Sequence, residues 1–128
     1  MFIEKVLVFC GLLIAFCGAV TLNQPFGGHF TYYNDKGTGA CGGYLDASSE
    51  MLVAVSYEWF TSPNPNNDPL CNYCLKVDYK WKSIKVPIKD KCPSCAKDHM
   101  DLSLPAFTAL EDPNVGNAYG ATFTFVEC

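Results

Sequence analysis

The chain has 128 residues with a formal net charge of −4, and its hydrophobic content of 49% suits a packed domain rather than a disordered segment. Its nine positive side chains are all lysines and are outnumbered by thirteen acids, which argues against the basic, arginine-rich face of nucleic-acid-binding proteins. We therefore expect no nucleic-acid partner.

Residues 1–21 have the features of a secretory signal peptide. The apolar run from Val6 to Val20 is shorter than the about 20 residues that span a bilayer, and the small residues Cys17-Gly18-Ala19 lie near its end. A buried N-terminal helix is the alternative interpretation. We expect export to the extracellular space, no membrane anchor, and one mature domain of residues 22–128.

The first half of the mature chain mixes strand and loop patterns. After a short leading arm at 24–28, the aromatic and β-branched residues 30–33 predict a strand, and the glycine-rich segment 34–43 predicts a loop. The apolar run 51–55 predicts a strand buried on both faces, followed by one helical turn over 57–60 that Ser56 would cap.

The prolines and asparagines of 62–70 predict a surface loop. Segments 73–79 and 84–88 alternate in hydrophobicity and predict a hairpin whose turn, Lys80-Trp81-Lys82, exposes Trp81. Many short strands are typical of a small closed barrel.

The C-terminal part predicts one helix and one strand. Ser103 and Pro105 favour a capped helix over 103–110, because serine accepts from the first free amides and proline suits the first turn. Residues 111–120 read as a turn-rich loop, and 121–127 alternate as a final strand.

Six cysteines remain once Cys10 and Cys17 leave with the signal, and an even count in a small exported domain predicts three disulfides. The Cys71-x-x-Cys74 and Cys92-x-x-Cys95 spacings also fit a zinc site, and the second fits a redox dithiol. Export favours oxidation, and no thioredoxin-like pattern surrounds the second pair. We expect neither metal nor cofactor.

Several motifs, taken in order, resemble those of double-psi β-barrel proteins such as expansin first domains, barwin, plant natriuretic peptides and rare-lipoprotein-A-like fungal proteins. The resemblance implies an all-β fold over nearly the whole mature chain: a six-stranded double-psi β-barrel with short helices, braced by disulfides. The motifs are Phe30-Thr31-Tyr32-Tyr33-Asn34, Gly37-Thr38-Gly39-Ala40-Cys41-Gly42, Asp90-Lys91-Cys92-Pro93-Ser94-Cys95, His99-Met100-Asp101-Leu102-Ser103 with Ala106-Phe107, and Phe123-Thr124-Phe125-Val126-Glu127-Cys128.

The resemblance to expansins and barwin also implies a disulfide pairing. It suggests Cys41–Cys71 and Cys74–Cys128, which leaves Cys92–Cys95 as a local bridge.

Two aspartates and a histidine within a dozen residues suggest a glycan site, because such sites use paired carboxylates. By resemblance, Asp101 matches the general acid of wall-cleaving relatives, and a partly buried position beside Asp90 would raise its pKa. The alternatives are structural. Asp101 would be a helix-start acid, Asp90 a strand-end carboxylate bonded to loop amides, and His99 a solvated loop residue.

Thr31 and Tyr33 correspond to groove-lining residues of expansins, with ordinary strand packing as the alternative. A phenol such as that of Tyr33 both stacks on a sugar and hydrogen-bonds to it. Asp35 has a spacing similar to the catalytic base of family 45 endoglucanases, which invert with carboxylates about 6.5–9.5 Å apart. Its loop lacks their neighbouring cysteine pair and tryptophan.

The sequence thus predicts a secreted, monomeric, expansin-like module that binds cell-wall or extracellular polysaccharide in a groove, without efficient hydrolysis. The groove residues would be Thr31, Tyr33, Asp90, His99 and Asp101, with Asp101 and Asp90 as the candidate catalytic pair if cleavage occurs. One alternative is a glycoside hydrolase or lytic glycosidase with Asp101 as general acid. Another is a secreted effector or inhibitor that uses the barrel as a scaffold, since fold alone does not choose among them.

We predict a mature form that starts between Val20 and Asn23 and carries no free thiol and no metal, because exported thiols oxidise. Intact mass of the native protein before and after alkylation tests this. Labelled thiols or stoichiometric zinc would contradict it.

Overall fold

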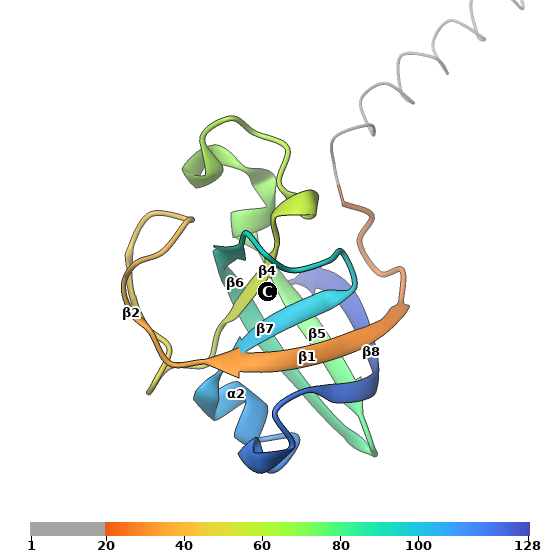
Figure 1. Cartoon of the computed structure of the whole chain (residues 1–128). Helices are drawn as coiled ribbons and strands as arrows, with labels where there is room; N and C mark the ends of the chain where they lie inside the picture. Colours follow the sequence, from red (N-terminus) through yellow and green to blue (C-terminus); the bar gives the residue numbers. More distant parts are fainter. Residues whose placement is uncertain (1–19) are drawn as a thin grey trace, which may run out of the picture.

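The computed structural model describes residues 20–128, so the expected signal peptide lies outside the described residues. Six strands close a barrel in the order β1-β7-β4-β6-β5-β8 (Figure 1). β1 runs parallel to β7 and β4 runs parallel to β6, whereas the other neighbours are antiparallel. The strands are β1 Phe26–Tyr33, β4 Val53–Ser56, β5 Tyr73–Tyr79, β6 Lys82–Cys92, β7 His99–Ser103 and β8 Ala118–Glu127.

Short elements surround the barrel. A two-stranded sheet of β2 and β3 stands at one side, and α2 lies beneath (Figure 1). The bounds are β2 Lys36–Thr38, β3 Tyr44–Asp46, η1 Tyr57–Trp59, η2 Pro65–Asn67, η3 Pro69–Asn72, α2 Leu104–Thr108 and η4 Pro113–Val115. Within residues 20–128 no helix has the length and apolar character needed to cross a membrane.

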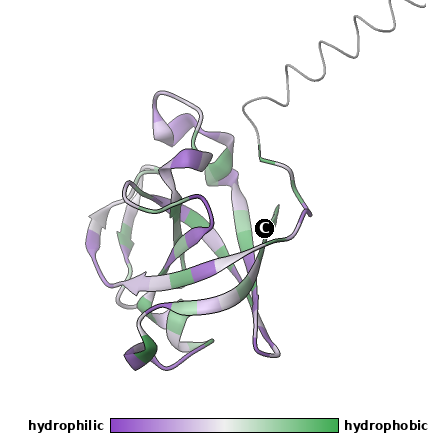
Figure 2. Cartoon of the chain, turned by 45° about the vertical axis from the view of Figure 1, so that its right-hand side comes forward, coloured by the Kyte–Doolittle hydropathy of each residue, from purple (hydrophilic) through white to green (hydrophobic). Residues whose placement is uncertain are grey.

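Apart from β4, the barrel strands fill the core with alternate side chains. Phe30 on β1, Met100 on β7 and Phe123 on β8 are completely buried, and the intervening residues face outward. Figure 2 shows this alternation as green and pale or purple residues along the strands. Phe30 packs edge-on against Tyr79 and Phe107, with ring centroids 5.0 and 5.2 Å apart. Full burial of one such side chain is worth about 1.5–3 kcal/mol.

β4 is buried on both faces, as its continuous apolar run predicts, with all four residues buried. Its outer face is covered because Ala54 packs with the Cys92–Cys95 bridge and with Tyr33. Ser56 follows as the predicted cap, and its hydroxyl accepts from the amide of Glu58 at the start of η1.

The sequence predictions miss some pairings in the N-terminal part. β1 begins at Phe26 rather than at residue 30, because it pairs with β8 as well as β7. The predicted loop 34–43 contains β2, which pairs with β3 and has no hydrophobic alternation to signal it.

The C-terminal boundaries also differ. The hairpin turn has only two residues, since Tyr79 pairs with Lys82, and β6 continues to Cys92. α2 is shorter than predicted, although Ser103 caps it, and β8 starts at Ala118 inside the predicted loop. β7 was not predicted as a strand, because its partners are distant in the sequence.

The six cysteines form three disulfides in the pairs that the resemblance implied: Cys41–Cys71, Cys74–Cys128 and Cys92–Cys95. No cysteine among residues 20–128 is therefore left as a thiolate for a zinc site. Cys74–Cys128 closes a span of 54 residues, and loops of this size are stabilised by about 2–4 kcal/mol when bridged.

Gly28 is the position where β1 approaches the loop before β7 most closely. A Cβ there would overlap the carbonyl oxygen of Asp98, whereas a Cβ on Gly27 would lie 3.8 Å from the nearest atom outside its chain neighbours. We expect Gly28→Ala to lower the free energy of unfolding by about 1–3 kcal/mol and Gly27→Ala to change it by less than about 0.5. Urea unfolding of both variants tests this, and equal effects would contradict it.

Candidate functional site

The residues predicted for the groove form a row across four neighbouring strands, β1, β7, β4 and β6. The row consists of Thr31, Tyr33, Asp90, His99 and Asp101. Ala54 on β4 pairs with Asp101 of β7 on one side and with Asp90 of β6 on the other. Asp101 in turn pairs with Thr31 of β1. Two strand spacings place the Cα atoms of the two aspartates about 10 Å apart. Ala54 between them is buried under Tyr33 and the Cys92–Cys95 bridge.

Thr31 links the histidine and one of the aspartates. Its hydroxyl donates to Asp101 Oδ1 at 2.9 Å and lies 2.7 Å from His99 Nε2. Because the hydroxyl proton points at Asp101, the network assigns the donor role to His99 Nε2–H. Burial, followed by the adjacent His29 ring, lowers the pKa of His99, which favours this neutral form. His99 is therefore a half-buried strand residue rather than a solvated loop residue.

Tyr33 occupies the space beside Asp90. Its hydroxyl donates to Asp90 Oδ2 at 2.9 Å, and the backbone amide of Ala40 donates to Asp90 Oδ1 at 2.9 Å. Burial, together with the Asp90 charge and hydrogen bond, raises the pKa of Tyr33, so the phenol remains a proton donor. Asp90 thus accepts from a loop amide, as its structural interpretation predicted, and its groove role stays a prediction.

Asp101 is a strand residue in β7, not a helix-start acid. Burial of the carboxyl raises its pKa, the hydrogen bond from Thr31 opposes this, and the charges of Asp35 and Asp90 add to the rise. The direction agrees with the expected effect of a partly buried position beside Asp90, with burial as the largest cause. Asp35 lies in the loop after β1, as expected.

Three further residues extend the row and were missed in the sequence. The His29 ring stacks between His99 and Tyr119, with centroids 4.4 and 5.0 Å away. His29 Nδ1 lies 2.8 Å from Asn117 Oδ1. The alternation of β1 could have found His29, which shares a face with Thr31. Asn117 and Tyr119 gave no signal, because they fall in a segment predicted as a loop.

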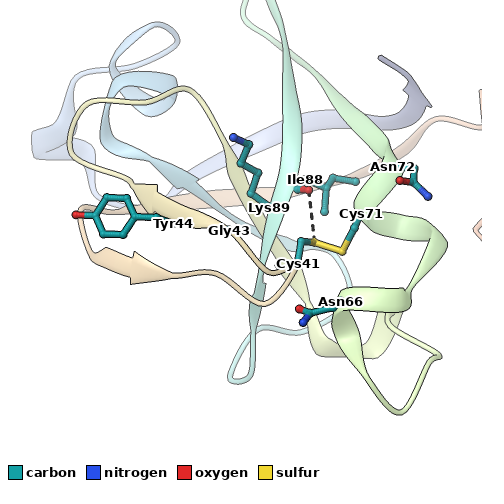
Figure 3. Close-up of a pocket in the computed structure, with 8 residues that line it drawn as sticks. All are labelled: Cys41, Gly43, Tyr44, Asn66, Cys71, Asn72, Ile88 and Lys89. Carbon is teal, nitrogen blue, oxygen red and sulfur yellow. Dashed lines mark hydrogen bonds between the residues drawn. A yellow bond between two sulfur atoms is a disulfide. The ribbon is translucent and has the colours of Figure 1, made fainter.

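A separate hollow of about 290 Å³ lies beside the Cys41–Cys71 bridge (Figure 3). Asn66, Asn72 and Lys89 supply its polar atoms. Cys41 Sγ lies 3.6 Å from the carbonyl oxygen of Ile88, a contact rather than a hydrogen bond because a disulfide sulfur carries no proton. Across residues 20–128, no three His, Cys, Asp or Glu side chains gather as a metal site would need.

Residues 26–121 match the double-psi β-barrel family model described as lytic transglycolase. The chain belongs to this double-psi β-barrel family. A relative of the same family, the papain inhibitor of Streptomyces mobaraensis, is 49% identical over 84% of this chain and 76% of its own. An allergen homologue of Arthroderma benhamiae is 33% identical over 74% of this chain, but only 32% of its length is matched.

Solved structures of double-psi β-barrels agree with these similarities. The structure of the Streptomyces papain inhibitor superposes with a TM-score of 0.83 at 49% identity, covering 84% of this chain and 99% of that one. A mutant expansin of Clavibacter michiganensis in complex with cellohexaose gives a TM-score of 0.64 at 29% identity. It covers 81% of this chain and 51% of the expansin.

The raised pKa of Asp101 predicts a pH-dependent stability. The neutral acid is favoured in the folded state, so its contribution is complete below the unfolded pKa of about 3.9 and is lost as pH rises through the folded pKa. The free energy of unfolding of Asp101→Asn should equal that of the unaltered protein at low pH and should exceed it at pH values above the folded pKa. Urea unfolding across pH measures this, with exposed Asp98→Asn as the control for charge removal. Parallel curves for the unaltered protein and Asp101→Asn would contradict the prediction.

Proposed function

We propose that this protein is a secreted inhibitor of cysteine proteases of the papain type. The observation that carries the proposal is its similarity to the Streptomyces papain inhibitor, at 49% identity over 99% of that structure. The matched region is the whole barrel with its loops, rather than one motif. This supports the scaffold alternative from the sequence more strongly than the expected polysaccharide module.

The described fold suits a protein that must survive contact with a protease. Cleavage of a folded protein requires local opening of the chain. Here Cys74–Cys128 ties the last residue to β5, and Cys41–Cys71 ties the loop after β2 to η3. Between Cys74 and Cys128 the chain forms β5, β6, β7 and β8 of the closed barrel. These ties oppose the local opening that cleavage needs.

We further propose that residues 22–128 are the mature, monomeric, extracellular domain and that it works without metal or cofactor. Three disulfides among residues 20–128 favour an oxidising compartment. No enzymatic activity is part of this proposal.

Polysaccharide binding at the row of Thr31, Tyr33, Asp90, His99 and Asp101 is the second candidate function. One observation favours it: these five side chains, taken from a resemblance to glycan-binding proteins, form two hydrogen-bonded sets on neighbouring strands, His99–Thr31–Asp101 and Tyr33–Asp90. A related expansin, 29% identical, has been crystallised with cellohexaose. Tyr33 and the exposed Tyr119 would supply the stacking surfaces.

The main proposal predicts that the protein slows peptide hydrolysis by papain in a saturable, concentration-dependent way and leaves trypsin unaffected. A sample with its disulfides reduced and alkylated is the matched control, because it keeps the sequence and loses the bracing. Full papain activity in the presence of excess native protein would contradict the proposal.

Retention on insoluble polysaccharides, with assay of released reducing ends, tests the second candidate in the same preparation. Binding at the row predicts that Asp101→Asn weakens retention while Asp98→Asn does not. Retention that is equal in all three proteins, or absent, would exclude this role for the row.

A further inference from the structure

The tip of the β5–β6 hairpin carries a tryptophan whose side chain is not buried in the fold. Tyr79 pairs with Lys82, so the turn consists of Lys80 and Trp81 alone. Trp81 is fully exposed, with a relative accessibility of 104%, as its place in a polar turn predicts. A tryptophan in water forgoes the largest apolar burial that any side chain offers. Its position is therefore not explained by the stability of this chain.

The backbone conformation at the tip makes a tryptophan at this position more unusual. Lys80 and Trp81 have φ angles of 44° and 71°. A two-residue hairpin turn with both φ angles positive favours Asn-Gly, because glycine has no side chain to strain that conformation. A bulky residue there is an outlier. Strained and exposed positions of this kind concentrate at functional surfaces.

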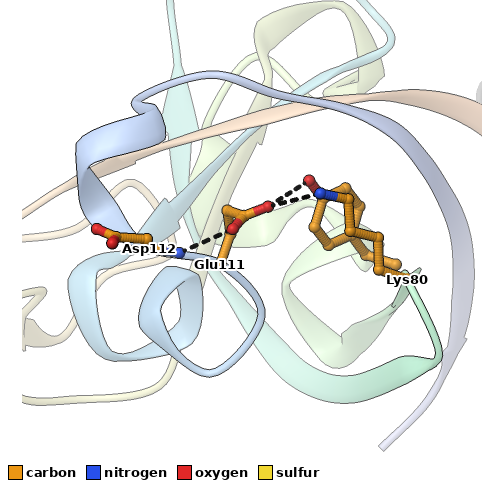
Figure 4. Close-up of polar contacts among 4 residues, drawn as sticks. Lys80, Glu111 and Asp112 are labelled. Carbon is orange, nitrogen blue, oxygen red and sulfur yellow. Dashed lines mark hydrogen bonds and ion pairs between the residues drawn. The ribbon is translucent and has the colours of Figure 1, made fainter.

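The base of the hairpin is tied to the barrel. One carboxylate oxygen of Glu111 accepts from Tyr79 at 2.7 Å and from Lys80 Nζ at 3.1 Å, and the other accepts from the amide of Asp112 at 3.1 Å (Figure 4). The Tyr79 bond, followed by those from Asp112 and Lys80, lowers the pKa of Glu111 to about 2. The hydrogen bonds from Tyr79 and Lys80 to the Glu111 carboxylate therefore persist at acidic pH. Tyr79 is itself 5% exposed and packs against Phe30.

The chemistry of the tip indicates what it would contact. Trp81 stands between Lys80, which is paired with Glu111, and the exposed Lys82, so Lys82 supplies the basic group beside the indole. A hollow of about 400 Å³ lies beside it, and its lining includes Asp78, Gly120 and Thr122. An apolar pocket with acidic groups at its rim complements these features.

We infer that Trp81 is the anchor with which this protein docks into an acid-rimmed apolar pocket of its papain-type protease. This assignment rests on the proposed function and names the surface responsible for it. Rigid tryptophans inserted into pockets dominate the affinity of many interfaces. A strained two-residue turn, tied to Glu111 through Tyr79 and Lys80, holds the backbone of the tip in place before binding, which lowers the entropy lost on association.

The test compares inhibition of papain by the unaltered protein, Trp81→Gly, Trp81→Phe and Tyr44→Ala. Tyr44 is the matched control, because it is also a largely exposed aromatic residue, on β3. Trp81→Gly should weaken inhibition by at least about thirtyfold. Trp81→Phe should retain most of the inhibition, and Tyr44→Ala should leave it unchanged.

Thermal melting separates a binding role from a structural one. Trp81→Gly should melt at the same or a higher temperature, because glycine suits the positive φ. Weakened inhibition together with undiminished melting supports the assignment. Undiminished inhibition by Trp81→Gly, an equal loss in Tyr44→Ala, or a lowered melting temperature that accounts for the loss would overturn it. Absence of inhibition by the unaltered protein would overturn the proposed function and this assignment with it.

Discussion

The candidate site depends on the parallel pairing of β1 with β7. Thr31 and Asp101 are 70 positions apart in the sequence, and only this pairing brings them within hydrogen-bond distance. Phe30 and Met100, the adjacent pair in the same register, are both completely buried. Because side chains alternate along a strand, a slip of one residue would expose Phe30 and bury Thr31. The apolar core therefore fixes the register of the polar row outside it.

Asp68 and Asp101 show that hydrogen bonds decide whether a buried aspartate has a raised or a lowered pKa. Asp68 is 4% exposed, and although burial acts to raise its pKa, bonds from the amides of Ser62, Leu70 and Thr61 lower it. Asp101 receives one bond, from Thr31, and its pKa is raised. The hydrogen bonds to Asp68 satisfy its carboxylate, so its role is structural. Asp101 retains acceptor capacity that the fold does not use, a condition more common at binding sites than in structural positions.

Local patterns predicted the parts of the fold that depend on neighbouring residues. The buried run of β4, the cap at Ser56 and the cap at Ser103 are of this kind, because each rests on contacts within a few positions. β7 was missed as a strand, since its pairing with β1 is long-range. The spacing of Asp90, His99 and Asp101 suggested a site, and a resemblance added Thr31 and Tyr33. His29 and Tyr119 were missed, because their stacking exists only once β1, β7 and β8 are adjacent.

Phe30 lies between the polar row and the hairpin tip, which remain separate surfaces. Its neighbours along β1, His29 and Thr31, face the outer row, whereas its ring packs inward against Tyr79 at the base of the hairpin. The row relies on carboxylates and a phenol, and the hairpin tip relies on an exposed indole between lysines. Either surface can change without loss of the core that holds both. The same barrel can accordingly serve a papain inhibitor and an expansin, because function resides in the groups that each barrel displays.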